Sequence, residues 1–179
     1  VYDEAGKPIE GVFVDQNNDG VINEKDLHLY HKSTPDVSVG LNSKLQWRNW
    51  DFDIAGHGAF GNWIYNSMGG GEMSPARLFA NLFLTNRTVE SLYSNFQTNK
   101  VLSDYYVRNA SYFRIDNITL GYSFPSIGSL KTSGRVYATV QNPFVITSYS
   151  GLDPEIDGGY DNSFYPRPIT FLLGVNLNF

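Results

Sequence analysis

Residues 15–26 have the spacing of a calcium-binding loop of the EF-hand type. The positions that supply ligands in such a loop all carry hard oxygen donors, from side chains or from a main-chain carbonyl: Asp15, Asn17, Asp19, Val21, Asn23 and Asp26. Gly20 stands at position 6, where the chain must turn sharply. The loop has Asp rather than Glu at position 12, so the spacing predicts a Ca²⁺ site of modest affinity. The alternative is an Asx-rich turn without metal.

Aromatic side chains are the other candidate binding residues. Rings of this kind stack on the faces of sugars, which makes four of them candidates for contact with a glycan: Trp63, Tyr65, Tyr149 and Tyr160. For Trp63 and Tyr65 a second role is open, because aromatic residues also collect where a membrane protein meets the lipid–water interface.

Catalytic constellations are missing from the sequence. The histidines are His28, His31 and His57, and no third ligand accompanies the close pair His28 and His31, which are best interpreted as surface or packing residues. Asp51 and Asp53 share a strand face without a partner for acid–base chemistry. The chain has no cysteine, no phosphate-binding loop and no nucleophile motif, so it is not predicted to be an enzyme.

Composition narrows the class of protein further. The 179 residues have a net charge of -5, which argues against a nucleic-acid binder, because such a protein needs clustered Lys and Arg. Charged residues make up 17%, below the roughly 25% of an ordinary soluble domain. No stretch is apolar enough for a spanning helix, and the first residues lack the features of a signal peptide.

A strict two-residue alternation of apolar and polar side chains predicts five long strands. The expected ranges are 36–47, 50–64, a third strand that ends at 124, 135–147 and 169–179. Phe113 and Ile115 fall on the opposite parity from Ile118 onward, which predicts either a bulge before Ile118 or the end of the membrane-level register. Pro143 cannot donate to a ladder, and it predicts a second bulge or a strand end.

The alternation fits either a soluble β-sandwich or lipocalin-like barrel, or an outer-membrane barrel, and three features favour the outer-membrane barrel. The polar faces are small and neutral, the aromatics cluster at strand ends, and short connections alternate with long ones. The predicted fold is therefore an all-β, antiparallel transmembrane β-barrel segment with one face toward outer-membrane lipid. Short turns at 48–49 and 125–134 then lie in the periplasm, and the loops 66–111 and 148–168 lie outside the cell.

Specific strings strengthen this interpretation. YFRIDNITLGYSFP (112–125), GLDPEIDGGYDN (151–162), FYPRPITFLLGVNLNF (164–179) and GVFVDQNNDGVINEKDL (11–27) closely resemble the C-terminal end of the SusC/RagA-type TonB-dependent outer-membrane transporters of Bacteroidetes. The resemblance implies a 22-stranded barrel with an N-terminal plug, a SusD-like surface lipoprotein as a lid, and import of glycans or oligopeptides powered through TonB. It also implies that the terminal Phe179 is part of a barrel-assembly signal.

The strand alternation and the loop lengths also divide the chain. Residues 1–35 are expected to form an extracellular segment with the calcium loop, and residues 36–179 the C-terminal barrel strands. About five strands are fewer than the eight of the smallest membrane barrels, and the plug, the TonB box and the signal peptide are not in this sequence. The chain is therefore interpreted as a fragment that would reach the TonB complex through an absent N-terminal region. The alternative is a soluble calcium-dependent carbohydrate-binding or adhesion module.

Overall fold

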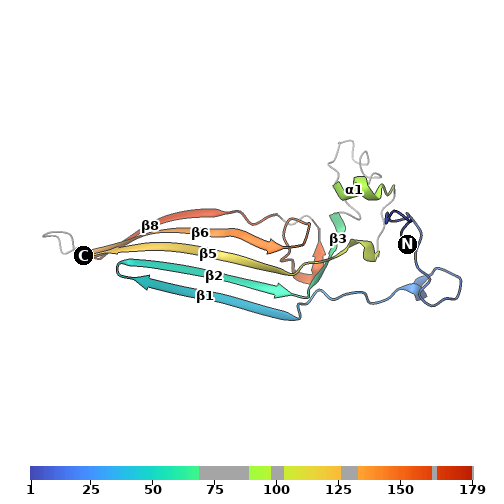
Figure 1. Cartoon of the computed structure of the whole chain (residues 1–179), viewed down its shortest axis with the longest axis horizontal. Coiled ribbons are helices and arrows are strands. Elements are labelled where there is room, and N and C mark those ends of the chain that lie inside the picture. Colours follow the sequence, from blue (N-terminus) through green and yellow to red (C-terminus); the bar gives the residue numbers. More distant parts are fainter. Residues whose placement is uncertain (69–88, 98–102, 126–132, 163–164, 179) are drawn as a thin grey trace. The chain divides into compact units, whose positions relative to one another are not determined.

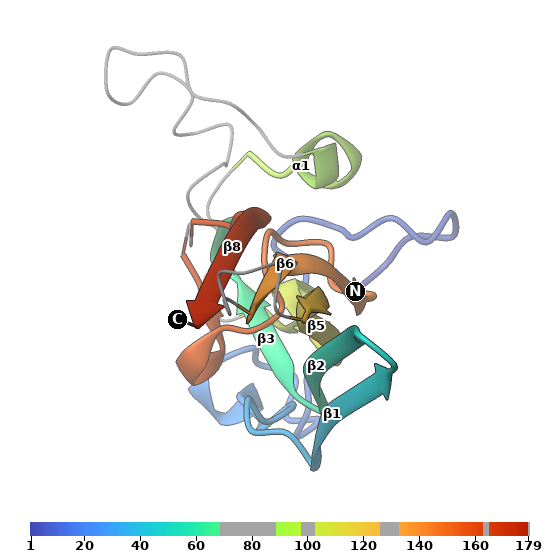
Figure 2. The ribbon, with the colours of Figure 1, turned by 90° about the vertical axis from the view of Figure 1, so that its left-hand side faces the viewer.

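Long antiparallel strands form the main sheet of the structure, a computed structural model that describes residues 1–68, 89–97, 103–125, 133–162 and 165–178. The strands are hydrogen-bonded in one five-stranded sheet in the order β1 (Val37–Trp47), β2 (Trp50–Phe60), β5 (Tyr112–Phe124), β6 (Ser133–Thr147) and β8 (Thr170–Asn178). Neighbouring pairs are antiparallel throughout (Figure 1). Figure 2 shows the same strands closer to end-on. The five predicted strands are confirmed.

The register explains how the strands turn and where they are irregular. Trp47 pairs with Trp50, so Arg48 and Asn49 make the turn, and Arg48 has a positive φ of 54°. The ladder of β5 with β6 is interrupted between Ile115 and Asn117. On the β6 side the interruption falls at Asn142, with φ 50°, and the following proline. Both predicted bulges are therefore present.

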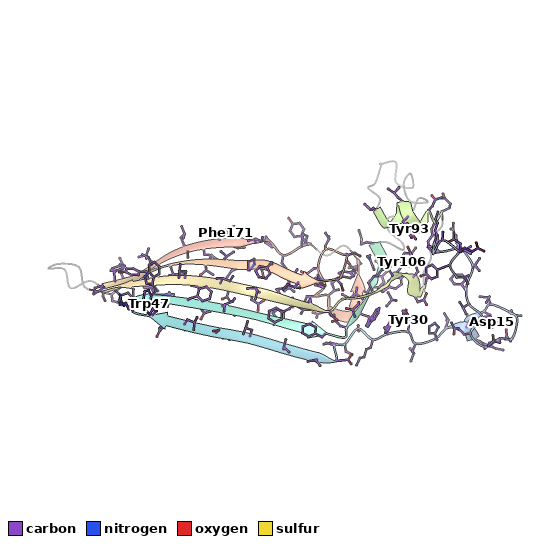
Figure 3. The ribbon with its side chains drawn as sticks, viewed as in Figure 1. Asp15, Tyr30, Trp47, Tyr93, Tyr106 and Phe171 are labelled. Carbon is purple, nitrogen blue, oxygen red and sulfur yellow. The ribbon has the colours of Figure 1, made fainter. Side chains whose placement is uncertain are left out.

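The two faces of the main sheet differ sharply in exposure. On the face that carries the apolar side chains, Phe171 is 77% exposed and Leu173 is 87% exposed, and Trp47 stands exposed at the turn end (Figure 3). On the opposite face, two charged residues are covered, with Asp51 at 8% and Arg114 at 4%. A water-soluble sheet shows the reverse arrangement, so the exposed face is suited to an apolar solvent.

A second group of segments packs as a unit of its own. Contacts group Val1–Ser33, Trp63–Arg108 and Ile156–Ser163 together (unit 1), and Thr34–Asn62, Asn109–Glu155 and Phe164–Phe179 form unit 2, which contains the main sheet. Unit 1 holds short elements, among them the helix α1 (Val89–Ser94) and the 3-10 helices η1 (Glu24–Asp26), η4 (Asp104–Tyr106) and η6 (Asp157–Gly159). Its sheet has the order β4 (Val107–Asn109), β3 (Trp63–Asn66) and β7 (Tyr160–Asp161).

One detail differs from the expected second strand. The alternation of apolar residues predicts that Ile64 continues the apolar face that begins at Trp50. The structure ends β2 at Phe60, because Gly61 takes a φ of 87° and turns the chain. Ile64 lies instead in β3, where it is 1% exposed. Within the described residues, the structure contains no helix that is both long and apolar enough to cross a membrane.

Candidate functional site

Charged side chains gather on the polar face of unit 2, where the main sheet meets the segment after β6. Arg114 of β5 pairs with His57 of β2 in the register, and both point to this face. The segment after β6 brings Asp153 and Glu155 to Arg114, and Arg167 comes from the stretch before β8. The side chains of Arg114 and Asp153 are only 5% and 8% exposed. A buried arginine of this kind is retained only where carboxylates neutralise it.

Arg114, Asp153, Glu155 and Arg167 form a closed ring of alternating charges, called the charge ring below. Arg114 donates from Nη2 to Asp153 Oδ1 at 2.6 Å, and its Nε lies 3.2 Å from Glu155 Oε2, close but not aligned as a hydrogen bond. Arg167 completes the ring, with Nη1 2.6 Å from Glu155 Oε2 and Nε 3.5 Å from Asp153 Oδ2. Two cations and two anions thus balance within one cluster.

His57 extends the cluster along the sheet. Its Nδ1 lies 2.9 Å from Asp116 Oδ2, and its Nε2 lies 3.4 Å from Glu155 Oε1. Asp116 is the extra residue at the bulge of β5, opposite no residue of β2. Bulges re-aim side chains, and this one directs a carboxylate toward the imidazole.

A second ion pair crosses the same face where β5 approaches its end. Arg135 of β6 donates from Nε to Asp51 Oδ1 of β2 at 2.9 Å, and from Nη2 to Oδ2 at 2.5 Å. The strand between them, β5, presents Gly121 opposite Asp51. A Cβ on Gly121 would lie 2.5 Å from both Arg135 Nη2 and Asp51 Oδ1. The pair therefore depends on the missing side chain, and Asp51 has a structural partner rather than a catalytic one.

The Gly121→Ala variant is expected to lose stability, because the new methyl group displaces the arginine and carboxylate that meet above it. Overpacking of this kind costs about 1–3 kcal/mol. The matched control is Gly40→Ala in β1, where a Cβ would meet nothing within 4 Å. The stability of both variants is measured as the midpoint of denaturant unfolding, which is followed by tryptophan fluorescence. Equal midpoints for the two variants would contradict the steric role of Gly121.

The loop 15–26 in unit 1 brings its predicted ligand residues into one hydrogen-bonded turn (Figure 3 labels Asp15). The N–H of Gly20 donates to Asp15 Oδ2 at 2.7 Å, and the N–H groups of Asp19 and Val21 donate to Asn17 Oδ1 and Asp19 Oδ1. Asn23 behaves differently, since its Oδ1 accepts from the N–H of Lys25 and its amide donates to the Val21 carbonyl. Asn23 thereby caps η1.

Two carboxylates of this loop lie against each other. Asp15 Oδ1 is buried without a hydrogen-bond partner. The N–H of Asn23 donates to the carboxylate of Asp26 and lowers its pKa against the opposing effect of burial, and the N–H of Gln16 and the adjacent Asp15 side chain lower it further. Among the described residues, no three His, Asp or Glu side chains gather as a metal-binding group. A cation here would therefore also need amide and carbonyl oxygens, which the loop offers.

The predicted aromatic residues fall into separate settings. Tyr65 of β3 and Tyr160 of β7 stack in parallel, with ring centroids 5.6 Å apart and planes at 4°. Trp63 stacks instead on His31, at 3.5 Å and 3°, which agrees with the interpretation of His31 as a packing residue. Tyr149 belongs to unit 2, where it is only 6% exposed. Tyr160 keeps 53% of its surface exposed.

Unit 1 also contains a largely apolar cavity of about 770 Å³. Its lining includes the aromatic residues Tyr65, Phe96 and Tyr105. Side chains within or beside the loop 15–26 complete it: Val12, Val14, Ile22, Leu27 and Tyr30. A cavity of this size and composition lies within the range of small-molecule binding sites.

Comparison with known proteins decides the family. No family model matches the chain. The TonB-dependent receptor SusC of Bacteroides thetaiotaomicron is 45% identical over 186 residues, which cover 100% of this chain and 18% of that protein. The chain is homologous to the SusC/RagA-type TonB-dependent receptors. These receptors are non-enzymatic outer-membrane proteins, which confirms the predicted family and location and the prediction that the chain is not an enzyme.

Other similar proteins agree. The TonB-dependent receptor P3 of Formosa agariphila is 27% identical over 94% of this chain and 19% of its own length. The solved structure of the RagAB peptide transporter aligns with a TM-score of 0.67 at 21% identity, over 84% of this chain and 18% of that chain. The RagAB peptide importer in the 'closed-closed' state covers the whole chain, with a TM-score of 0.66. The chain thus spans about a fifth of the length of its relatives, and its sheet corresponds to part of their barrel fold.

Sequence reasoning did not find the charge ring. The sequence offered one indication of this cluster: Arg114 lies on the polar side of a predicted strand, in a chain that has few charged residues. Asp153 and Glu155 flank a proline in the loop 148–168, and Arg167 lies between two prolines. Nothing in the local pattern links these residues, because they meet only when the loop folds back onto β5.

Proposed function

We propose that this chain forms five neighbouring strands of a barrel of about 22 strands, in a receptor that imports oligomeric nutrients across the outer membrane. The observation that supports it most directly is the reversed surface of the main sheet, with large apolar side chains exposed on one face and Asp51 and Arg114 covered on the other. Barrels of that size have a wide lumen closed by a plug. The same reversal argues against the alternative of a soluble calcium-dependent β module, which would expose its apolar face to water.

The proposed receptor acts with two partners. A SusD-like surface lipoprotein covers the outer loops 66–111 and 148–168, and the TonB complex supplies energy through a part of the receptor outside this chain. The fold match to the RagAB peptide transporter supports a two-component importer. Much of the loop 66–111 lies outside the described residues, as does the proposed assembly signal at Phe179.

The proposed substrates are glycans, with oligopeptides as the second class. Support for glycans comes from the exposed ring of Tyr160, held by its stack on Tyr65, and from the nearby indole of Trp63 in the same unit. Flat aromatic faces of this kind suit sugar rings. Tyr149 is covered in this chain and contributes less to the proposal. Support for peptides is the substrate named for the RagAB relatives.

Uptake by the whole receptor tests this function. The receptor that carries this sequence is expressed with its lipoprotein partner in a host that lacks both, and growth is measured on defined oligosaccharides and on defined oligopeptides. We expect growth on at least one oligosaccharide class that depends on the receptor and on TonB. Growth only on peptides would replace the glycan assignment, and growth unaffected by the receptor on every substrate would refute an import function.

We also propose that the loop 15–26 binds Ca²⁺. Asp15, Asn17, Asp19, the Val21 carbonyl and Asp26 would hold the ion, with Asn23 as a more distant ligand, and the ion would neutralise the adjoining carboxylates of Asp15 and Asp26. The buried, unpartnered Asp15 Oδ1 supports this proposal, because an orphaned carboxylate oxygen needs a cation or a donor. The low ligand charge corresponds to affinities of about 10⁻⁴–10⁻³ M, typical of extracellular sites.

The Asp15→Asn variant is expected to lose calcium-dependent stabilisation, because it removes the charge that faces Asp26. Thermal denaturation of the receptor with and without about 5 mM Ca²⁺, well above the expected dissociation constant, measures the effect. The matched control is Asp3→Asn, since Asp3 also accepts backbone N–H groups in an exposed turn but lies outside the loop. Equal calcium shifts in wild type and Asp15→Asn would rule out this site.

In the absence of calcium, low pH should destabilise the same loop. The pKa of Asp26 is lowered in the folded state from 3.8, so its hydrogen bonds stabilise the loop fully above pH 3.8. That stabilisation is lost as the pH falls through the lower folded value. Hydrogen exchange of residues 16–26 in chelator, corrected for intrinsic rates, should therefore rise only below about pH 4. Asp26→Asn should abolish the transition.

A further inference from the structure

The charge ring joins two points of the chain on either side of a loop. Glu155 precedes the residues that leave unit 2 for unit 1, and Arg167 follows their return. Arg167 Nη1 lies 2.6 Å from Glu155 Oε2. The ends of the segment 156–166 are therefore closed by an ion pair, as in an Ω-loop, whose ends lie close together. The described part of this loop carries the exposed rings of Tyr160 and Tyr165.

Arg114 fixes this closure to the sheet. It lies in β5, which is paired on both sides, and its side chain contacts both Asp153 and Glu155. The main-chain N–H of Glu155 also donates to Asp153 Oδ1 at 2.9 Å, which helps to orient the Asp153 carboxylate toward the arginine. A planar guanidinium can bridge two carboxylates in this way, whereas an ammonium group offers one compact charge.

The four side chains of the charge ring differ in solvent exposure, so the ring has a buried inner pair and a more exposed outer pair. The side chains of Arg114 and Asp153 are 5% and 8% exposed, whereas those of Glu155 and Arg167 are 27% and 41% exposed. The inner pair anchors the residues next to the sheet, and the outer pair closes the loop. Removal of Arg167 therefore opens the loop while the buried pair stays intact. A variant at Arg167 therefore tests the closure of the loop without disturbing the buried pair on which folding depends.

We propose that Arg114 and Arg167 are positioning residues of the importer, which hold both ends of the segment 156–166 on the polar face of the barrel wall. The consequence for uptake rests on the proposed function, since the held segment carries Tyr160, a proposed substrate contact. A loop held at both ends loses less conformational entropy when substrate binds, so its closure favours affinity. The maximal rate, which depends on the energised steps, is unaffected.

Hydrogen–deuterium exchange on the whole receptor in detergent micelles tests the closure. The Arg167→Gln variant should exchange the amides of residues 156–162 about fivefold faster, the effect of one partly exposed ion pair on local opening. Arg167→Lys should restore part of the protection. Arg135→Gln is the matched control, because it removes an arginine from the other ion pair on the same face. Equal exchange in Arg167→Gln and the control would overturn the proposal.

Uptake kinetics separate positioning from a merely structural role. Arg167→Gln should raise the KM for uptake about threefold or more, with the maximal rate and the surface level of receptor unchanged. Faster exchange without any change in KM would overturn the role in uptake. No transport by the wild-type receptor would refute the proposed function instead, and the exchange measurement would still decide whether the charge ring holds the loop.

Discussion

The Arg114→Met variant should lower the free energy of unfolding by about 3–5 kcal/mol, because the buried Asp153 loses its close cation and keeps only the 3.5 Å contact with the more exposed Arg167. Asp153 is 6% exposed, so water cannot take the place of the arginine without opening the loop. Methionine fills a similar volume and adds no polar atom, which confines the change to charge and hydrogen bonding. Guanidinium unfolding of the receptor in micelles, followed by tryptophan fluorescence, gives the free energy of unfolding.

Two further variants bracket this result. Arg114→Lys keeps the charge but offers a single point of contact, so we expect about half of the loss. Arg48→Met removes an arginine from the exposed turn between β1 and β2, where the guanidinium lies 5.1 Å from the centre of the Trp47 ring. A change of about 0.5 kcal/mol is usual for such surface positions. A loss in Arg114→Met no larger than in Arg48→Met would show that the charge ring contributes little to stability.

The Leu173→Arg variant should fail to assemble or lose about 2–4 kcal/mol, the cost of a cation on the lipid face near the middle of a membrane strand. Leu173 is 87% exposed and stands near the centre of β8. Leu172→Arg provides a control with the same change of residue one position away, on the opposite face, where Leu172 pairs with Thr139. That variant should assemble normally.

Heat-modifiable mobility in gels and the free energy of unfolding in lipid vesicles measure both leucine variants. If Leu172→Arg and Leu173→Arg were equally tolerated, neither face would meet lipid. If Leu172→Arg alone were harmful, the face that carries Leu172 would meet the lipid, and the face that carries Leu173 would not.

Local patterns in the sequence predicted the main sheet because each strand alternates on its own. The structure has strands at Val37–Trp47, Ser133–Thr147 and Thr170–Asn178, close to the expected 36–47, 135–147 and 169–179. The bulges were also predictable, since a change of parity and an interior proline are local signals. The short strands β3, β4 and β7 were not predicted, because two to four residues cannot show a period.

The sites differ in the same way. The loop 15–26 was predictable in its spacing, because all its ligand positions fall within one continuous stretch. The stack of Tyr65 on Tyr160 and the contact of Arg114 with Asp153 join residues far apart in the chain, and only the fold brings them together. Tyr149 resembles Tyr160 in sequence terms, yet one ring is covered and the other is exposed.

The reversed faces of the main sheet impose opposite limits on how this sequence can diverge. Fluid lipid adapts to any apolar shape, so Leu173 and its neighbours on that face can exchange freely for apolar residues of other sizes. Gly121 has no such freedom, since any side chain there meets the Asp51–Arg135 pair. Over long divergence, substitutions should therefore accumulate fastest where the side chains are most hydrophobic, the reverse of the pattern expected in a water-soluble protein.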